Sequence, residues 1–270
     1  MTRIADTFNR LRAEHRVGLV TYTTAGDPDL ARSADILRAL DRAGADVLEV
    51  GVPFSDPLAD GPVIQRATER ALAAGTNLRG VLDTIARIRS DISAPIVVFS
   101  YANPILRMGT ERFAQQAAAS GVDGVLALDL PIEEAGEFRA TLRANGLDTI
   151  FLLSPTTTTG RIVKAGELGS GFLYGISRLG VTGARDTIAA GAEAMVRRIR
   201  AHTALPIALG FGISRPEHVA EVGVYADAAV VGSALVSVIA DAGGAPDLVD
   251  RVEQYVRWLK SAAPAAAPRV

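Results

Sequence analysis

The chain has 270 residues, of which 49% are hydrophobic and 21% charged, and its formal net charge is −2. This composition is typical of a globular protein with a large apolar core, and it argues against disorder and against nucleic acid as a partner. There is no cysteine, which excludes disulfides, thiolate metal sites and a cysteine nucleophile. Residues 1–16 alternate charged with apolar side chains, and no later run is long enough to span a bilayer, so we expect a cytoplasmic protein without a membrane segment.

Histidine and lysine are scarce, and this scarcity limits the possible chemistry. The histidines are His15, His202 and His218, each in a stretch with helical character, and the lysines are Lys164 and Lys260. A histidine-based metal cluster or a serine triad therefore lacks suitable residues, and we expect no metal site. Neither lysine ends an apolar strand, which argues against a Schiff base in a barrel. Carboxylates remain as the candidates for acid and base chemistry.

Apolar, strand-like runs alternate with amphipathic stretches along the chain. Apolar residues at helical spacing predict an opening helix over residues 2–15. Further helices are predicted between successive strands, with two of them, at 62–74 and 78–89, after the second strand. Strands are predicted at 17–23, 47–52, 95–101, 124–128, 149–153, 172–176, 206–209 and 228–231.

Local signals indicate where several helices begin and end. Asp27-Pro28 predicts a capping residue followed by proline at the first helical position, and Gly44 predicts the end of that helix. Ser214 and Glu217 have the spacing of a capping box at the start of a later helix. The final helix carries an apolar stripe that includes Leu248, Val252, Tyr255 and Leu259.

Eight strands that alternate with helices predict an α/β fold, a (β/α)8 TIM barrel with an extra N-terminal helix and an extra helix after strand 2. No linker divides the chain, so we expect a single domain over 1–270, with an Ala- and Pro-rich tail at 262–270 that is flexible. A doubly wound open sheet is the alternative, but it usually has fewer strands, and no GxGxxG follows the first strand. In a barrel, the loops after all strands open at one end, where residues distant in sequence converge.

Glu49 is the anomaly of the second strand. Its neighbours form a continuous apolar run, of the kind that is buried on both faces of a parallel sheet. An ionised carboxylate there must be paired, hydrogen-bonded or protonated. One interpretation is a general acid or base with a raised pKa at the mouth of a pocket. The other is a buried partner for one of the many arginines.

Asp60 and Asp129 are ambiguous when each is considered alone. Asp60 stands directly before Gly61-Pro62, and Asp129 stands shortly before Pro131. Each aspartate could be a helix cap or a functional carboxylate. The role of Asp129 stays open, although we expect it to support the loop network near Asp60 rather than to transfer protons.

Glycine-rich loops follow the last two predicted strands. The seventh strand ends in Gly210-Phe211-Gly212 and the eighth in Gly232-Ser233. In a (β/α)8 barrel these two loops, with a short helix N-terminus, form the usual phosphate site, and Gly183 after the sixth strand could add a third N–H donor. The alternative is that these glycines only allow tight turns.

A set of apolar and aromatic residues lies near the ends of the strands. These residues could be ordinary core, or they could line an apolar cavity between the phosphate and the carboxylates, which would fit a substrate with an anionic tail and a flat apolar head. The loop 179–185 has the small residues of a lid, with Arg178 before it, but it could also be a plain surface loop. The candidate lining residues are Tyr22, Phe99, Leu126, Leu128, Leu152, Tyr174 and Phe211.

Residues 48–62 closely resemble the signature of the tryptophan synthase alpha subunit family, and the resemblance covers nearly the whole chain. This long signature is highly specific, whereas the glycine pairs alone would match many phosphate-binding barrels. The other matching motifs are Thr24-Ala25-Gly26-Asp27-Pro28, Tyr101-Ala102-Asn103-Pro104, Ser177-Arg178-Leu179-Gly180-Val181-Thr182-Gly183, Gly210-Phe211-Gly212-Ile213 and Val231-Gly232-Ser233-Ala234.

The resemblance implies a carbon–carbon lyase that cleaves indole-3-glycerol phosphate to indole and D-glyceraldehyde 3-phosphate in tryptophan biosynthesis. Glu49 would be the acid and base for the ring carbon and the glycerol hydroxyl, and Asp60 would bind the indole N–H. Thr182 would meet Asp60 when the lid closes, and Tyr174 would line the pocket. The loops with Gly183, Phe211, Gly212, Gly232 and Ser233 would hold the phosphate.

The family also implies a partner, a pyridoxal-phosphate beta subunit that receives indole through a tunnel in an alpha2beta2 heterotetramer. The cofactor belongs to that partner, so this chain is expected to have none. One departure is Tyr22, where many members carry phenylalanine, and its hydroxyl needs a polar or wet neighbour. The residues that fall where the family makes the partner contact are Pro53, Asp56, Asn103, Pro104 and Pro131.

Two other functions remain open from the sequence. The chain could be a stand-alone lyase that releases free indole and needs no partner. It could also be a barrel retained mainly as an allosteric binding subunit. The presence of both Glu49 and Asp60 argues against the allosteric alternative.

Overall fold

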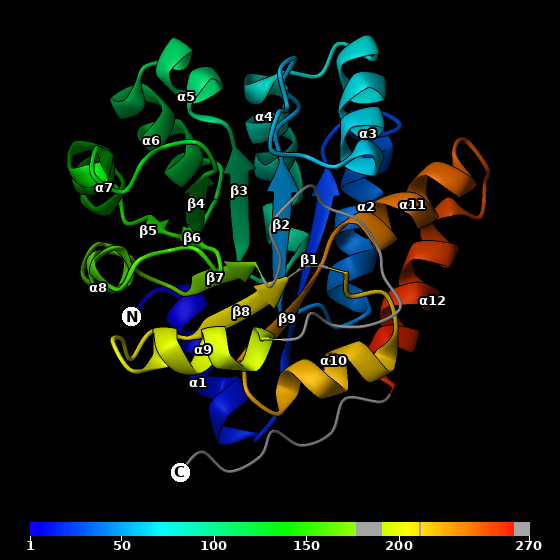
Figure 1. Cartoon of the computed structure of the whole chain (residues 1–270). Helices are drawn as coiled ribbons and strands as arrows, with labels where there is room; N and C mark the ends of the chain where they lie inside the picture. The colour runs from blue at the N-terminus through cyan, green and yellow to red at the C-terminus, as the bar shows by residue number, and fades with distance from the viewer. Residues whose placement is uncertain (177–190, 211, 262–270) are drawn as a thin grey trace.

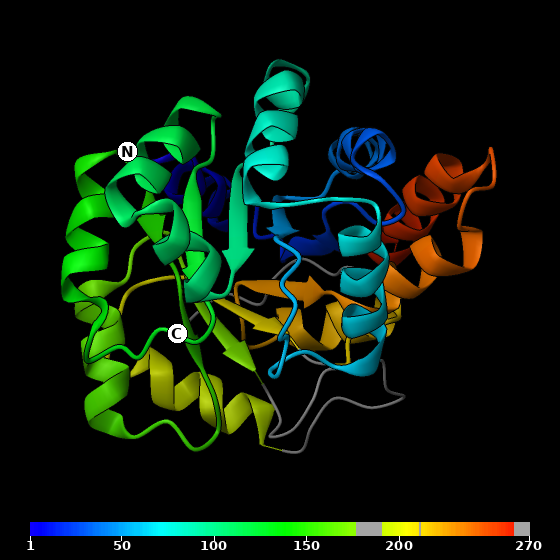
Figure 2. The same cartoon turned by 90° about the horizontal axis from the view of Figure 1, so that it is seen from above.

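The computed structural model describes residues 1–176, 191–210 and 212–261. Its strands form one parallel sheet in the order β5-β4-β3-β2-β1-β9-β8-β7-β6. The strands lie at the centre of the molecule and the helices surround them (Figures 1 and 2). They are β1 (Gly18–Thr24), β2 (Val47–Gly51), β3 (Ile96–Ser100), β4 (Gly124–Ala127), β5 (Asp148–Thr149), β6 (Phe151–Leu153), β7 (Leu173–Ile176), β8 (Ile207–Gly210) and β9 (Ala228–Val231).

The sheet closes on itself because its two outer members are parts of one chain segment. Strands β5 and β6 are separated only by Ile150, and they pair with β4 and β7 respectively. Because β5 and β6 share one position, the nine strands fill the eight strand positions of a parallel barrel. The predicted (β/α)8 fold is therefore confirmed. The helices are α1 (Arg3–Ala13), α2 (Leu30–Arg42), α3 (Pro62–Ala73), α4 (Leu78–Ile88), η1 (Arg89–Asp91), α5 (Ala102–Met108), α6 (Thr110–Ala119), α7 (Ala135–Ala144), α8 (Thr159–Leu168), α9 (Ala192–Arg200), α10 (Pro216–Gly223), α11 (Ser233–Ala242) and α12 (Leu248–Lys260).

The extra helices are where the sequence predicts them. Helix α1 precedes the first strand, and both α3 and α4 follow β2. Two further helices, α5 after β3 and α11 after β9, were not predicted. The single domain over 1–270 stays a prediction, because residues 262–270 lie outside the described part of the chain.

Two predicted helix caps are wrong. Helix α2 is capped by Asp29, whose side chain accepts a hydrogen bond from the Arg32 N–H at 2.8 Å. Asp27 does not cap the helix, because its carboxylate forms an ion pair with Arg70. Helix α10 begins at Pro216 after Arg215, with no side-chain cap bond. The predicted capping box therefore fails, since Glu217 stands at the second position of the helix rather than at the third.

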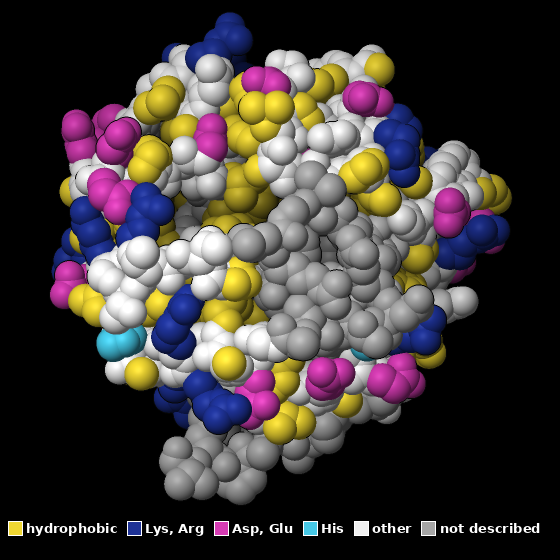
Figure 3. Space-filling model, in the orientation of Figure 1, with side chains coloured by type: hydrophobic (Ala, Val, Ile, Leu, Met, Phe, Trp, Pro, Cys, Tyr) yellow, Lys and Arg dark blue, Asp and Glu magenta, His cyan; other side chains and the backbone are white. Residues whose placement is uncertain are grey.

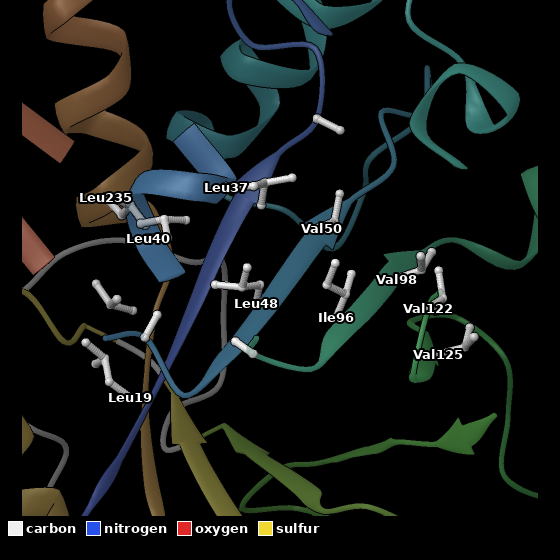
Figure 4. Close-up of a cluster of buried hydrophobic side chains, with 14 of the residues drawn as sticks. Leu19, Leu37, Leu40, Leu48, Val50, Ile96, Val98, Val122, Val125 and Leu235 are labelled. Atoms are coloured by element: carbon white, nitrogen blue, oxygen red, sulfur yellow. The ribbon is translucent and has the colours of Figure 1, made fainter. Parts of the chain in front are cut away.

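Side chains alternate along the strands, so each strand contributes to two cores. In β2, Leu48 and Val50 belong to the outer core between strands and helices, whereas Val47 belongs to the inner core of the barrel. Figure 4 shows part of the outer core, where side chains of α2 and the strands meet. Burying each such aliphatic side chain stabilises the fold by about 1.5–3 kcal/mol.

Helix α1 closes the end of the barrel at which the strands begin. Its buried residues Ile4, Phe8 and Leu11 belong to the same inner cluster as the strand residues, and the rings of Phe8 and Phe172 lie 5.6 Å apart. The opposite end, where the strands finish, is left for a site. Within the described residues, no helix is long and apolar enough to cross a membrane.

Candidate active site

Glu49 lies in the middle of β2, one position from Val50 of the outer core, so its side chain faces the barrel interior. The strand register places it between Tyr22 of β1 and Val97 of β3. The residue is 0% exposed, and neither carboxylate oxygen has a hydrogen-bond partner among the described residues. Burial raises the pKa of Glu49 to about 8. Among the described residues Glu49 is therefore an unpaired carboxyl group, its raised pKa favours the protonated form at neutral pH, and no described arginine is its partner.

Asp60 ends the loop between β2 and α3 and is buried, with 6% of its surface exposed. The cap position of α3 belongs to Gly61, with no side-chain cap bond, so Asp60 is not the helix cap. Its Oδ2 accepts from the Tyr101 hydroxyl at 3.1 Å, and that hydroxyl accepts from the Ala59 N–H at 3.1 Å. Burial raises the pKa of Asp60 to about 6, although the Tyr101 hydrogen bond acts in the opposite direction.

The two carboxyl groups and two tyrosines share one electrostatic environment. The pKa of Tyr22 is raised first by burial and then by the charges of Asp60 and Glu49. The pKa of Tyr174 is also raised well above its usual value, by burial and then by Glu49 and Tyr22. Residues from four separate segments therefore meet at the carboxyl end of the barrel. Carboxyl groups with pKa values of about 8 and about 6 suit proton transfer near neutral pH.

Tyr22 finds its polar neighbour within its own strand. Its hydroxyl lies 3.5 Å from the Thr24 hydroxyl, at the long limit of a hydrogen bond. The space for this phenol comes from Gly51, where an added Cβ would lie 2.3 Å from the Tyr22 oxygen. The ring of Tyr22 meets Phe99 edge to face, with centroids 5.3 Å apart. Tyrosine thus fits this position because β2 ends in glycine.

The predicted apolar lining residues that the structure describes come together around these groups. Leu126 is part of the inner core, and Phe99, Leu128 and Tyr174 pack against it from the side of the mouth. Leu152 is the register partner of Tyr174 across β6 and β7. Hydrophobic side chains are visible in the recess over the strands in Figure 3. The arrangement is an apolar wall beside two acidic groups.

The glycine loops after the last two strands open at the same end. Gly212 has φ +86°, which favours glycine, and Gly232 is the cap residue of α11, with no side-chain cap bond. Ser233 is the first residue of α11 and is buried. A Cβ on Gly232 would lie 3.7 Å from the Tyr22 Cβ, so this helix N-terminus borders the pocket. Thr182, Gly183 and Phe211, together with Arg178 and the loop 179–185, lie outside the described residues.

Tyr101 is a candidate site residue that the sequence did not single out. It directly follows β3, and its hydroxyl connects the Ala59 amide to the Asp60 carboxylate. The available signal was a tyrosine at the end of a barrel strand, inside a matching family motif. Asp129 supports the same segment, because its Oδ1 accepts from the Ala102 N–H at 2.6 Å. This geometry agrees with the expectation that Asp129 serves the loop network.

The candidate partner residues lie on loops and helices near this mouth. Pro53 is buried just after β2, and Asp56 is exposed in the same loop. Asn103 and Pro104 lie in α5, and Pro131 is exposed ahead of α7. Two leucines stand out on this side, Leu58 at 79% exposure and Leu106 at 63%. A cavity of about 330 Å³ opens between α5, α6 and α7, lined in part by Ile105, Leu106, Leu130 and Phe138, with Glu134 and Glu137.

Metal chemistry has no obvious site in the part of the chain that the structure describes, where no group of three or more His, Asp or Glu side chains is close enough to hold an ion. The mouth offers instead two carboxyl groups without a cationic partner among the described residues, and an apolar wall beside them. They suit acid–base chemistry on a flat apolar group.

Comparisons with known proteins agree on one family. The family model described as tryptophan synthase alpha chain matches residues 8–264. The chain is 50% identical over 262 residues to the tryptophan synthase alpha chain of Geobacter sulfurreducens, which covers 97% of this chain and 99% of the relative. The crystal structure of tryptophan synthase subunit alpha from Legionella pneumophila has a TM-score of 0.89 at 37% identity, and covers 97% of this chain and 98% of that one. A chain of Mycobacterium tuberculosis tryptophan synthase has a TM-score of 0.90 at 35% identity, with 99% of both chains covered.

Proposed function

We propose that Glu49 and Asp60 carry out the reaction of the tryptophan synthase alpha chain family, to which this chain belongs. The chain is a lyase that cleaves indole-3-glycerol phosphate to indole and D-glyceraldehyde 3-phosphate. The observation that carries the proposal is the presence of two buried carboxyl groups at one mouth, with pKa values of about 8 and about 6. Among the described residues, neither side chain pairs with a cation.

Glu49 is the proposed acid and base. Its protonated carboxyl group gives a proton to the indole ring carbon that bears the glycerol chain, which converts the ring into a cationic leaving group. The resulting carboxylate takes the proton of the adjacent glycerol hydroxyl while the carbon–carbon bond breaks and its electron pair returns to the ring. The carboxyl group ends the cycle protonated, as it began. The pKa of about 8 supports this assignment, because it keeps Glu49 protonated at neutral pH.

Asp60 is the proposed partner of the indole N–H. The ring nitrogen becomes positively charged when the ring carbon is protonated, and a fixed carboxylate beside it stabilises that charge in the transition state. The pKa of about 6 leaves Asp60 mainly ionised at pH 7, which this role requires. The hydrogen bond from Tyr101 holds the carboxylate in place.

The phosphate of the substrate is proposed to bind across the mouth, at Gly212, Gly232 and Ser233. The support is the free N-terminus of α11, whose backbone N–H groups and dipole favour an anion. The lining residues Tyr22, Phe99 and Tyr174 then enclose the indole between phosphate and carboxyl groups. Thr182, Gly183 and Phe211 are part of the same proposal from the family motifs alone.

The chain works as the alpha subunit of an alpha2beta2 heterotetramer, and pyridoxal phosphate belongs to the beta subunit, so the alpha chain has no cofactor of its own. We propose that the partner contacts Pro53, Asp56, Asn103, Pro104 and Pro131. Exposed leucines in the same loop and helix, Leu58 and Leu106, support this, because exposed apolar side chains are typical of an interface.

A cytoplasmic site of action is also part of the proposal. The substrate is a phosphate ester, and its charge prevents passage through a lipid bilayer. The enzyme must therefore share a compartment with the enzymes that make and use this compound. Cell fractionation combined with an activity assay tests this point.

The experiment that tests the site compares Asp60→Asn with the unchanged chain, each alone and in complex with its beta subunit. Indole formation from indole-3-glycerol phosphate is measured together with binding of glycerol 3-phosphate. We expect turnover to fall at least about 100-fold, in the range for a lost group that stabilises transition-state charge, while phosphate binding changes less than about twofold. Equal losses in both would show that Asp60 has only a structural role.

The same assay separates the alternative functions. Stimulation of indole formation by the beta subunit is expected for an alpha subunit that passes indole to its partner. A rate that no beta subunit changes would favour a stand-alone lyase that releases free indole. An inactive complex in which the chain still activates its partner would favour a mainly allosteric subunit.

A further inference from the structure

Helix α3 begins at Pro62, two residues after Asp60, and holds the loop that precedes it. The Gln65 side-chain amide, one turn into the helix, donates to the Asp60 carbonyl oxygen at 2.9 Å and to the Pro57 carbonyl oxygen at 3.4 Å. The Asp60 N–H donates to the same Pro57 carbonyl at 3.0 Å. The turn that carries Asp60 is therefore closed on itself and attached to the helix by Gln65.

The other end of α3 is attached to the segment after β1. Arg70 binds Asp27 through two hydrogen bonds, Nε to Oδ1 and Nη2 to Oδ2, both 2.8 Å long. Asp27 is only 3% exposed, so its carboxylate depends on this partner. A planar guanidinium that binds a carboxylate through two parallel bonds fixes orientation as well as distance.

The segment that carries Asp27 is itself attached to the strand of Glu49. The Ala25 N–H donates to the Gly51 carbonyl at 2.9 Å, and Gly51 is the last residue of β2, two positions after Glu49. A continuous set of contacts thus leads from β2 to Asp27, from Asp27 to Arg70, along α3 to Gln65, and from Gln65 to Asp60.

We propose that Gln65 and Arg70 are positioning residues that set the location of Asp60 relative to Glu49. The inference rests on the proposed role of Asp60 in cleavage. Both residues act through backbone or a second side chain and not on the reacting atoms. Acid–base chemistry is sensitive to such placement, since a misplacement of about 1 Å can cost about 100-fold in rate.

The test uses Gln65→Met, which keeps the length and helix preference of the side chain but removes the amide donors. Indole formation is measured in the complex with the beta subunit, and binding of glycerol 3-phosphate in parallel. We expect kcat to fall about tenfold while the phosphate ligand binds within about twofold of the unchanged protein, because α11 and not α3 holds the phosphate. The matched control is Gln116→Met in α6, a half-buried glutamine without a side-chain hydrogen bond in the described ranges.

Arg70 is tested by a graded pair. Arg70→Lys keeps the charge but cannot form both parallel bonds, and Arg70→Met removes both charge and bonds. We expect kcat to decrease in the order Arg, Lys, Met, and partial rescue by lysine distinguishes positioning from simple loss of helix packing. Thermal unfolding of each variant shows whether the fold persists. If kcat stays unchanged in both Gln65→Met and Arg70→Met, the inference is wrong.

A double variant separates this inference from the assignment of Asp60. If Gln65 acts through Asp60, Gln65→Met should cause no further loss of kcat in the Asp60→Asn background. A further tenfold loss there would contradict the inference. If Asp60→Asn alone retained its rate, the proposed function of Asp60 would fail, whatever Gln65 does. An equal fall in turnover and phosphate binding in Gln65→Met would also overturn the positioning role.

Discussion

Asp46 at one end of the barrel and Glu49 and Asp60 at the other are buried carboxyl groups with very different partners. Where the strands begin, the buried Asp46 and Asp227 each have an arginine and a backbone donor. Asp46 binds Arg16 through two hydrogen bonds and accepts from the Leu19 N–H at 2.9 Å. Where the strands finish, Glu49 has no partner among the described residues and Asp60 has only a tyrosine hydroxyl.

The beginning of the strands repeats one arrangement. In four pairs of neighbouring strands, a side chain that precedes one strand accepts a hydrogen bond from the backbone N–H of a residue at the start of the other strand. The acceptor and donor pairs are Asp46 with Leu19, Asp123 with Ile96, Ser170 with Thr149, and Asp227 with Ile207. An arginine accompanies each aspartate, namely Arg16, Arg89 or Arg200. These contacts connect neighbouring strands, so they serve stability.

Carboxyl side chains therefore serve two purposes in this barrel, according to their partners. A carboxylate with a guanidinium and a backbone donor is stable in its ionised form and chemically inert. A carboxyl group buried without a cation keeps its proton more tightly and can exchange it near neutral pH. Unpaired burial of a carboxyl group is costly to the fold, and Glu49, with neither oxygen bonded among the described residues, lies at the end where the loops form the candidate site.

The largest expected effect comes from Glu49→Gln, which keeps the shape of the protonated side chain but cannot exchange a proton. We expect kcat for indole formation to fall about 1,000-fold, within the usual range for general acid–base groups. The melting temperature should not fall, because no hydrogen bond is lost. Steady-state kinetics and thermal unfolding check both statements. A variant that keeps most of its rate would remove the acid–base assignment.

The second effect is a pH dependence of stability. The pKa of Glu49 is about 8 in the folded chain against an ordinary value of 4.5, so the folded state binds more protons between these values. Its free energy of unfolding must therefore fall as pH rises from about 4.5 to 8. Relative to Glu49→Gln, we expect the unchanged protein to lose on the order of 2–4 kcal/mol over that range. Denaturant titrations of both proteins at pH 5 and pH 8 test this, and parallel pH profiles would contradict it.

At the other end of the barrel, Asp46→Asn should reduce stability and leave catalysis alone. It removes the charge that pairs with Arg16, and we expect a loss of about 2 kcal/mol, below the usual range for a broken buried pair because Arg16 is 31% exposed. The control is Asp35→Asn, whose exposed pair with Arg38 should matter by less than about 0.5 kcal/mol. Chemical denaturation measures both. A large fall in kcat for Asp46→Asn would break the division between the two ends.

The smallest effect is expected for Tyr101→Phe. The phenylalanine removes the hydrogen bond that lowers the pKa of Asp60, so this pKa should rise above about 6 and the acidic limb of the rate profile should move to higher pH. We expect a loss of up to about tenfold in kcat/KM at pH 7, as for one lost hydrogen bond to a charged group. The control is Tyr225→Phe, a half-buried tyrosine whose side chain makes no hydrogen bond among the described residues. An unchanged acidic limb would show that Tyr101 does not tune Asp60.

Strand positions follow closely from local sequence. The prediction for β9 agrees with the structure residue for residue, at Ala228–Val231, because a buried parallel strand reads as an apolar run that needs no information from elsewhere. Helices α5 and α11 were missed for a related reason. Helix α5 spans only Ala102–Met108 and contains a proline, and α11 is nearly all apolar, so neither has an amphipathic pattern.

Helix caps and the roles of single carboxylates do not follow from local sequence. Asp27 looks like a cap beside its proline, but Arg70, 43 residues away, takes its carboxylate, and Asp29 caps the helix instead. Asp60 looks like a cap as well, yet its side chain binds Tyr101, 41 residues away. In both cases a partner distant in sequence decides which hydrogen bond forms.

Eight apolar runs separated by helices are enough to predict the barrel, and Glu49 is recognisable as a candidate because a charged residue interrupts one of those runs. Three features depend on the tertiary fold: Glu49 has no partner among the described residues, Asp60 is bound by Tyr101, and the charges of both carboxyl groups act on Tyr22. The physical reason is that periodicity records which side of a strand is buried, whereas a pKa depends on every charge and dipole that the fold brings near.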